Sequence, residues 1–592
     1  MQLTMRKYLM YNEYNKKRCT KIMKRIIQYL LIISMCFTLF GCENTGDLEV
    51  QEKFDAYLDE LIKEELESDY LSYHYMIVDG NHLDIHKPEV SLGSLTLDSS
   101  LESIESSKEE LKELQTFDLK ELTTSQQEIY TLLEIQLKEN IEYEKYLNFD
   151  YCFGDNQVND NLITNFTEYR FDDKEDILDF VTLLEDSGRY IDEGIQRTLE
   201  LSKDGFIQNE LIKETVIESC EKFIQSEEIE KNFSAQIKNM NLTTDEIKEY
   251  EKQVKNAVDT IMQPAYQRIV DCYKGLPTSK YQGSLSEMKG GKEYFEYLLR
   301  VNVGSDRSAE DWIEIMDSEV EETLMKWVMV MITNENVEEE VKNVQLPKNN
   351  VYELVQYLEN CIDTEFPKID KVDYRVNYLD ASVASDLVSA YYVVPPIDAP
   401  SKNVIKVNPN NTDLVSLFST LAHEGFPGHL YQNNYAVQQE QPLIYRFLDR
   451  LGSSEGWAEY VGIDSYRIAG IGSEAFQEYM KQYNYLNMIL VEYIDLRVNY
   501  SGWNIDDITV YLEEVGLVSD IAQSLYENVL KNPAVYAPYS LGTYEVLNLR
   551  EKAELKLKDK FDPISFNQAL LDAGTVHFNI IEKKINDYIK NK

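Results

Sequence analysis

Apolar residues recur three and four positions apart along much of the chain, with charged residues between them. From residue 47 to about residue 145 this spacing is regular, and residues 104–145 repeat the style of the first segment. The first apolar stripe consists of Phe54, Tyr57, Leu58, Leu61 and Ile62. A period near 3.6 is typical of amphipathic helices. Residues 171–335 continue this pattern, with breaks near residues 275–277 and 290–291. We therefore predict a mainly α-helical protein.

One segment departs from the helical period. Residues 389–409 (SAYYVVPPIDAPSKNVIKVNP) are rich in tyrosine and valine and predict two short strands around a proline-rich turn. Because proline cannot donate to a strand ladder, the first strand should lie at a sheet edge. Residues 410–413 (NNTD) follow and are able to cap a helix. We expect a small mixed or antiparallel β-sheet beside the next helix.

The helix predicted over residues 413–426 is apolar on nearly all sides, so it should be buried. Its polar stripe consists of Ser416, Ser419, Thr420 and His423, which lie within about 100° around the helix. A buried helix with one polar stripe must face polar partners or a cavity.

Two of the six histidines, His423 and His429, lie close together in the stretch TLAHEGFPGHLY. On a regular helix this spacing would separate them by about 120° and 9 Å, too far for one ion. Pro427 and Gly428 intervene. Proline removes a helical hydrogen bond, and glycine accepts almost any backbone angle. We therefore expect the helix to break and to return His429 to the side of His423.

A zinc site needs a third protein ligand and an open position. The stretch SSEGWAEYVG (residues 453–462) offers Glu455 and Glu459 on one face of a helix. We predict that Glu455 is the third ligand and that Glu459 orients a ligand histidine. Taken alone, a histidine on a buried helix is usually a hydrogen-bonded core residue, and paired glutamates are usually solvated. Together with Glu424, these residues complete the inventory of a hydrolytic Zn²⁺ site.

The charge of the chain excludes one class of partner. The formal net charge is −47 over 592 residues. Such a body repels nucleic acid and anionic membrane surfaces, so we exclude nucleic-acid binding. The simplest interpretation of the charge is a solvated acidic surface without a specific partner. The 14 prolines and 24 glycines are few for this length and agree with long helices.

Residues 1–42 have the features of a targeting signal rather than of a folded segment. Basic residues precede an apolar run over residues 26–40, which is too short for a transmembrane helix and suits a signal peptide. The run ends in LFGC, which resembles the lipobox of bacterial lipoproteins, with Cys42 as the lipidated residue. The leader could begin at Met1, Met5 or Met23. We expect export and a lipid anchor on the outer face of the cell membrane. A plain secretory signal is the alternative.

The motifs HEGFPGH and EGWAEY resemble the bacterial family called domain of unknown function 885, whose members carry H-E-x-x-P-G-H and a later E-G-W-A-x-Y. Residues 392–396 (YVVPP), residues 539–542 (YSLG) with Arg550, and residues 561–574 resemble further segments of that family. The chain departs from the family at Leu430, often a histidine, and at Glu459, often a leucine. The resemblance spans most of the chain from about residue 50.

The resemblance implies a zinc metallopeptidase of the gluzincin kind, with a helical body divided by a deep active-site cleft and a small sheet at the site. No linker interrupts residues 43–592, which we predict to form a single domain. Its N-terminal helical lobe would span about residues 50–335 and its catalytic lobe about residues 336–592.

These inferences combine into a mechanism. His423, His429 and Glu455 would hold Zn²⁺, which lowers the pKa of a bound water. Glu424 directly follows His423 and is the predicted general base, which takes the water's proton and passes it to the leaving amine. We therefore predict a zinc-dependent hydrolase, a carboxypeptidase- or oligopeptidase-like enzyme with a peptide substrate.

Two further residues are candidates for contacts with substrate. Tyr539 could donate its phenol to the oxyanion, although most of the 42 tyrosines must be packing residues. Arg550 could bind a substrate carboxylate, or it could form an ordinary ion pair in an acidic body. The alternative functions are a non-catalytic surface lipoprotein that binds peptides or glycans with a structural metal, and a metal-dependent esterase or amidase.

The cysteines after the leader carry no metal-site spacing. Cys152, Cys220, Cys272 and Cys361 lie far apart, without a C-x-x-C motif. A domain of this size does not need disulfides for stability. We expect mostly buried free thiols.

Overall fold

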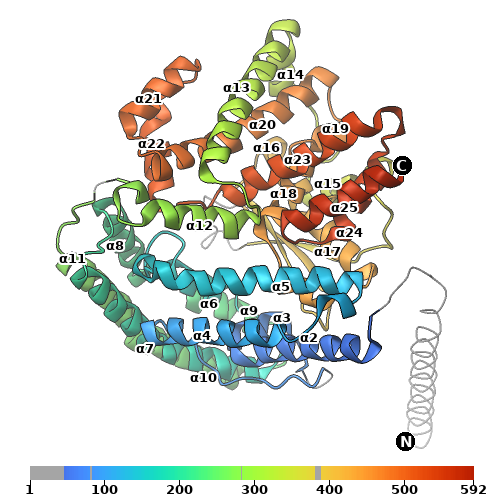
Figure 1. Ribbon diagram of the computed structural model, residues 1–592. Helices are drawn as coiled ribbons and strands as arrows, with labels where there is room; N and C mark the ends of the chain where they lie inside the picture. Colours follow the sequence, from blue (N-terminus) through green and yellow to red (C-terminus); the bar gives the residue numbers. More distant parts are fainter. Residues whose placement is uncertain (1–45, 81–82, 282, 380–388) are drawn as a thin grey trace, which may run out of the picture.

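The computed structural model describes residues 46–80, 83–281, 283–379 and 389–592. Helices dominate it, as the apolar spacing predicts (Figure 1). Residues 48–359 form α2 (Leu48–Ser68), α3 (Tyr70–Met76), α4 (Leu97–Leu114), α5 (Thr124–Glu142), α6 (Val158–Thr167), α7 (Lys174–Lys203), α8 (Glu210–Ile224), α9 (Glu228–Ile237), α10 (Thr244–Ala257), α11 (Gln263–Gly275), α12 (Gly291–Val303), α13 (Ala309–Thr333), α14 (Val337–Asn343) and α15 (Val351–Glu359).

The second half of the chain begins with three strands and continues as helices. The strands are β1 (Tyr374–Tyr378), β2 (Ala390–Val393) and β3 (Asn403–Val407). The helices that follow are α16 (Leu414–Glu424), α17 (His429–Gln438), α18 (Leu451–Gly462), α19 (Ser465–Ile468), α20 (Glu474–Asp495), α21 (Ile505–Glu514), α22 (Ala522–Lys531), α23 (Ala537–Leu557), α24 (Pro563–Ala573) and α25 (Phe578–Asn591).

Local sequence signals set many of the helix ends. The side chain of Thr123 caps α5 and Gln126 bonds back to the cap, a reciprocal arrangement that satisfies two unpaired backbone donors. Asp413 caps α16, as the NNTD cluster predicts. The breaks predicted near residues 275 and 290 are confirmed, because α11 ends at Gly275 and α12 begins at Gly291.

The sheet has the strand order β1-β3-β2. β1 runs parallel to β3, and β2 runs antiparallel to it. The predicted strand pair corresponds to β2 and β3, whereas β1 was not predicted. Among the described strands β2 pairs with β3 alone, so it lies at an edge of the sheet. The predicted class, a mainly α fold with a small mixed sheet, is confirmed.

The buried apolar residues form two large clusters. One cluster joins the helices between residues 54 and 137 to those after residue 295. The other lies between residues 70 and 273 and is formed largely by α6 to α11. In Figure 1 the long teal helix α7 lies on the side opposite the orange and red helices, and α5 lies between them. The boundary between lobes near residue 335 stays a prediction.

Two further sequence expectations can be compared with the described residues. The four cysteines are free, with Cys152 and Cys220 buried and Cys272 and Cys361 half-buried. No described helix is both long enough and apolar enough to span a membrane. The predicted leader and Cys42 lie outside the described residues.

Candidate metal centre

A break between α16 and α17 sets the position of the two histidines. α16 ends at Glu424, and α17 begins at His429. At Gly428, an added Cβ would lie 1.8 Å from the carbonyl oxygen of His423, so any other residue would force the backbone apart. The Trp457 indole donates to the carbonyl of Pro427 at 3.0 Å and fixes the turn against α18. The break predicted from Pro427 and Gly428 is confirmed.

The break brings three ligand-type side chains together. The Nε2 atoms of His423 and His429 each lie 3.3 Å from Oε2 of Glu455. One ligand atom from each residue falls within 4.8 Å of the others. Among the described residues, these three form the single group of histidine, cysteine or acidic side chains with this geometry. Two imidazole nitrogens and one carboxylate oxygen are a donor set that suits zinc.

Glycines place the helix that carries Glu455. An added Cβ at Gly456 would lie 2.5 Å from the backbone carbon of Gly542, so α18 and α23 cross in direct backbone contact. At Gly452, an added Cβ would lie 2.2 Å from the carbonyl oxygen of Val303 in α12. Real Cβ atoms do not approach so closely, so these positions require glycine. These contacts hold α18 where Glu455 lies next to both histidines.

Tyr539 reaches the site across this glycine contact. Its ring lies 6.5 Å from the ring of His423, at 18° between the planes. Burial raises the pKa of Tyr539, and the carboxylates of Glu455 and Glu424 raise it further. The phenol therefore keeps its proton at neutral pH, and its hydroxyl bonds to no described residue. Tyr539, a candidate from the sequence, therefore lies beside the cluster. Its role in catalysis stays a prediction.

Glu459 lies one turn beyond Glu455 on α18. Its Oε1 is 3.2 Å from Nδ1 of His423. Since the Nε2 atom of His423 faces Glu455, the two ring nitrogens face different carboxylates. A carboxylate on the second nitrogen can orient a ligand histidine. Here the contact is at ion-pair distance without hydrogen-bond geometry.

Glu424 is held by the edge of the sheet. The backbone amide of Tyr392 in β2 donates to Oε2 of Glu424 at 2.8 Å. The other oxygen, Oε1, lies 3.7 Å from Nε2 of His423. Glu424 is only 8% exposed, and burial raises its pKa, although His423 and His429 oppose the shift. The Tyr392 amide was not predicted, because any residue type can supply a backbone N–H.

The cluster favours a cation. Burial alone would raise the pKa of Glu455, but its contacts with His423 and His429 hold it well below its usual range. Burial would lower the pKa of His423, yet Glu459, Glu424 and Glu455 raise it well above its usual value. The carboxylates thus favour positive charge among the imidazoles, whether it is supplied by a proton or by a metal ion.

Arg550 lies outside this cluster. Its guanidinium bonds to Glu554 at 2.8 Å and to the hydroxyl of Tyr460. It also lies over the rings of Tyr460 and Phe561, at 5.7 and 5.6 Å. These contacts fit a packing and ion-pair role. Its role in substrate binding stays a prediction.

Comparison with known proteins places the chain in a family. A family model described as "Bacterial protein of unknown function (DUF885)" matches residues 84–585. The chain belongs to the DUF885 family. No curated protein matches this DUF885 protein.

Solved structures share the fold of this DUF885 protein. A "putative lipoprotein" from Colwellia psychrerythraea has a TM-score of 0.78 at 15% identity, covering 92% of this chain and 100% of its own. A "putative lipoprotein of unknown function" from Shewanella oneidensis has a TM-score of 0.58 at 14% identity, covering 92% and 99%. A "putative oligoendopeptidase F" from Bacillus anthracis str. Ames has a TM-score of 0.31 at 10% identity, covering 84% and 95%, and carries no argument. At these identities the first two show the fold alone.

Proposed function

We propose that this DUF885 protein is a zinc-dependent hydrolase, most readily a peptidase. The observation that carries the proposal is the convergence of His423, His429 and Glu455 directly beside the buried carboxylate of Glu424. The order of these residues also resembles that of gluzincin peptidases. Structural zinc sites are closed by four protein ligands, whereas catalytic sites use three and leave one position open.

In this proposal, different side chains bind the metal and transfer the proton. His423, His429 and Glu455 would hold the ion, which when bound supplies Lewis acidity and makes water more acidic. Glu424 is the proton carrier: Oε1 accepts the proton of the attacking water and delivers it to the leaving nitrogen. The Tyr392 amide fixes the other oxygen of Glu424, so the carboxylate stays aimed at the cluster.

Two neighbours support these groups in the proposal. Glu459 orients the ring of His423 through Nδ1. Tyr539 is protonated and its hydroxyl bonds to no described residue, so it can donate a hydrogen bond to the oxygen that gains charge as water adds to the scissile carbonyl.

We propose that the protein is exported and lipid-anchored at Cys42. α2 begins at Leu48, so a short tether would connect the lipid to the first helix. The proteins of similar fold are called lipoproteins, which supports the same interpretation. Mass spectrometry of the membrane fraction should detect a mature chain that begins at a lipidated Cys42. An unmodified N-terminus would contradict the proposal.

The function is tested by metal analysis coupled to a peptide-library digest. The purified protein should contain about one zinc ion per chain and should cleave peptides, and a chelator should abolish cleavage until zinc is restored. Zinc without turnover would instead support a structural metal in a binding protein. Cleavage of ester libraries with no cleavage of peptides would identify an esterase.

A further inference from the structure

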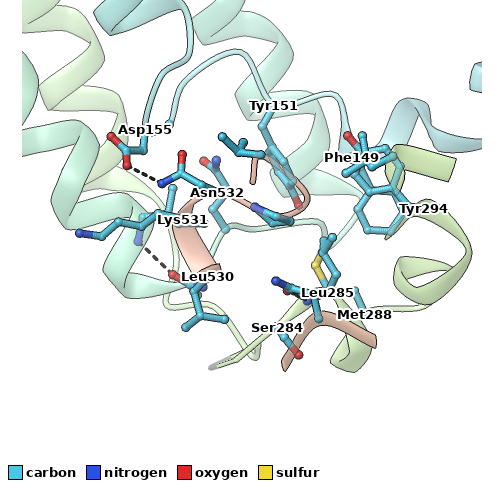
Figure 2. Close-up of a pocket in the computed structure, with 18 of the residues that line it drawn as sticks. Phe149, Tyr151, Asp155, Ser284, Leu285, Met288, Tyr294, Leu530, Lys531 and Asn532 are labelled. Atoms are coloured by element: carbon cyan, nitrogen blue, oxygen red, sulfur yellow. Dashed lines mark hydrogen bonds between the residues drawn. The ribbon is translucent and has the colours of Figure 1, made fainter. Parts of the chain in front are cut away.

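A pocket of about 340 Å³ lies apart from the three predicted ligands (Figure 2). Residues from three distant parts of the chain line it, in the ranges 143–212, 281–302 and 499–535. Its volume lies within the range of small-molecule and side-chain pockets.

The pocket offers aromatic and aliphatic surface. Phe149, Tyr151 and Tyr294 supply rings, and the rings of Phe149 and Tyr294 stack at 4.7 Å with 10° between their planes. Leu285 and Leu530 add aliphatic surface. Figure 2 shows the side chain of Lys531 extending away from Tyr151, so its charge does not point into the pocket. Polar residues, Asp150 and Asp155 among them, share the lining, so an apolar group would fit against the aromatic side of the pocket.

Most amide side chains around the pocket are already paired. Gln208 donates to the carbonyl of Phe153 and accepts from the hydroxyl of Tyr273. Asn532 donates to Asp155, and Asn499 donates to Asp495 while it accepts from the backbone of Leu285. These bonds build a rigid frame and leave few groups to bind the many hydroxyls of a sugar. This argues for a ligand with few polar groups.

Tyr151 is the exception. Its hydroxyl is buried and has no hydrogen-bond partner among the described residues. Figure 2 shows its ring projecting between Asn532 on one side and Phe149 and Tyr294 on the other. The hydroxyl has almost no accessible surface, so a ligand can pair with it only if the Tyr151 ring shifts as the ligand enters. Because an unpaired buried hydroxyl destabilises the protein, that shift would be favoured by a ligand that offers one hydrogen bond. A peptide carbonyl beside an apolar side chain has this chemistry.

Two chain paths place the pocket near the metal centre. Val535 lines the pocket and precedes Tyr539 by four residues, which limits their backbone separation to about 14 Å. On the other side, Asn302 lines the pocket, and the next residue, Val303, contacts Gly452. Gly452 lies one helical turn, about 5 Å, before Glu455. An extended peptide advances about 3.3 Å per residue, so about four residues would cover the upper limit of about 14 Å between Val535 and Tyr539.

We propose that this pocket is a distal subsite for peptide substrates, which takes an uncharged apolar or aromatic side chain about four residues from the cleaved bond. The proposal rests on the proposed function, because it assumes that the reacting bond lies at the metal centre. It assigns the protein to extended oligopeptides rather than dipeptides.

The test measures binding, so that it does not depend on turnover. Zinc-loaded Glu424→Gln protein is titrated with two- and six-residue alanine peptides, blocked at both ends, in which one phenylalanine occupies each position in turn. The six-residue peptides with phenylalanine about four residues from the bond that wild type cleaves should bind at least about tenfold more tightly than the two-residue ones, the gain expected from burying one aromatic side chain. If no bond is cleaved, the optimum is taken from binding alone.

Two variants and a matched control complete the experiment. Val535 is 43% exposed, so Val535→Trp should fill the pocket without unfolding the protein and remove the gain from length. Val518→Trp, at a valine that is 67% exposed outside the pocket, should keep it. Tyr151→Phe should weaken binding of the long peptide by about threefold or more without lowering the melting temperature, because it removes an unpaired hydroxyl.

The outcomes separate the two proposals. A ratio of long- to short-peptide affinity that is the same in Val535→Trp and Val518→Trp would overturn the subsite. Binding of oligosaccharides that depends on Val535, without binding of peptides, would overturn it as well. Length-dependent peptide binding that Val535→Trp abolishes, in a wild-type protein that cleaves no peptide, would leave the pocket as a peptide site and remove the peptidase.

Discussion

Buried acids in two regions of this protein differ in protonation state. At the metal centre, Glu455 lies between His423 and His429, while burial raises the pKa of the neighbouring Glu424. Glu492 and Asp495 lie one helical turn apart on α20 and are both 0% exposed. Asp495 accepts hydrogen bonds from Asn499 and from the backbone of Ala534, but neither acid has an ion-pair partner among the described residues.

The side chains around each buried acid determine whether that acid is ionised. At the metal centre the histidines overcome burial and hold the pKa of Glu455 well below its usual range. On α20, burial and the charge of Asp495 raise the pKa of Glu492 well above its usual value, and burial raises the pKa of Asp495 to about 7. Burial of an acid therefore does not indicate a functional site. A site is indicated where a buried acid remains ionised because ligand-type side chains surround it.

The largest expected effect is on turnover. Glu424→Gln keeps the size of the side chain and its bond from the Tyr392 amide but cannot accept a proton. Because general-base catalysis contributes about 10²- to 10⁴-fold, kcat on a cleaved peptide should fall by that factor. Zinc content should stay at the wild-type level. Wild-type turnover in this variant would remove Glu424 from the mechanism.

The next effect is on metal binding. Glu455→Gln removes the one ionised ligand oxygen between the two histidines, so zinc affinity should fall by about 100-fold or more. Zinc at a hundred times its Kd stabilises a folded protein by about 2.7 kcal/mol, and a chelator should remove this stabilisation from wild type only. Thermal unfolding with and without chelator measures it. Glu514→Gln, at an exposed glutamate on α21, is the matched control and should respond like wild type.

A smaller effect is expected at Glu459. Glu459→Ala removes the carboxylate that faces Nδ1 of His423 while leaving all three ligands in place. Loss of such an orienting group typically lowers metal affinity by about 10- to 100-fold, and a competition titration with a zinc indicator measures it. If the affinity is unchanged, Glu459 is only a neighbour of the site.

The proximity of His423, His429 and Glu455 was largely predictable because its signals are local. Pro427 and Gly428 predict a break in the helix between His423 and His429. The distance in sequence from His429 to Glu455 is long enough for a later helix to pack back against them. The helices followed from the apolar period, and β2 and β3 from their tyrosines and valines. Each of these signals depends on residue type within a short window.

What could not be predicted depends on tertiary packing. The Tyr392 amide that holds Glu424 carries no sequence signal, because every residue except proline has the same donor. β1 pairs with a strand that follows it by about 25 residues, a parallel pairing that its short sequence does not specify. Glu492 and Asp495 have the spacing of ordinary solvated acids, and their burial follows from the packing of α20 against neighbouring helices, α13, α22 and α23 among them.

The smallest expected effect concerns the two buried acids on α20. The folded-state pKa of Asp495 is raised to about 7 and that of Glu492 well above its ordinary value of 4.5, so above about pH 5 the folded protein binds more protons than the unfolded chain. The pair therefore makes the free energy of unfolding fall as the pH rises from about 5 to 8. Below about pH 4 both states hold the protons and the penalty is absent.

Glu492→Gln replaces an acid that must stay protonated with a neutral amide of the same shape. Its free energy of unfolding should therefore exceed that of wild type by about 1 kcal/mol or more at pH 8 and match wild type below about pH 4. Urea denaturation at both pH values measures the difference, and Glu514→Gln should show none. An equal effect of Glu492→Gln at both pH values would mean that the α20 acids are not held protonated. The contrast with the ionised Glu455 would then fail, and burial among histidines would no longer separate a functional acid from a structural one.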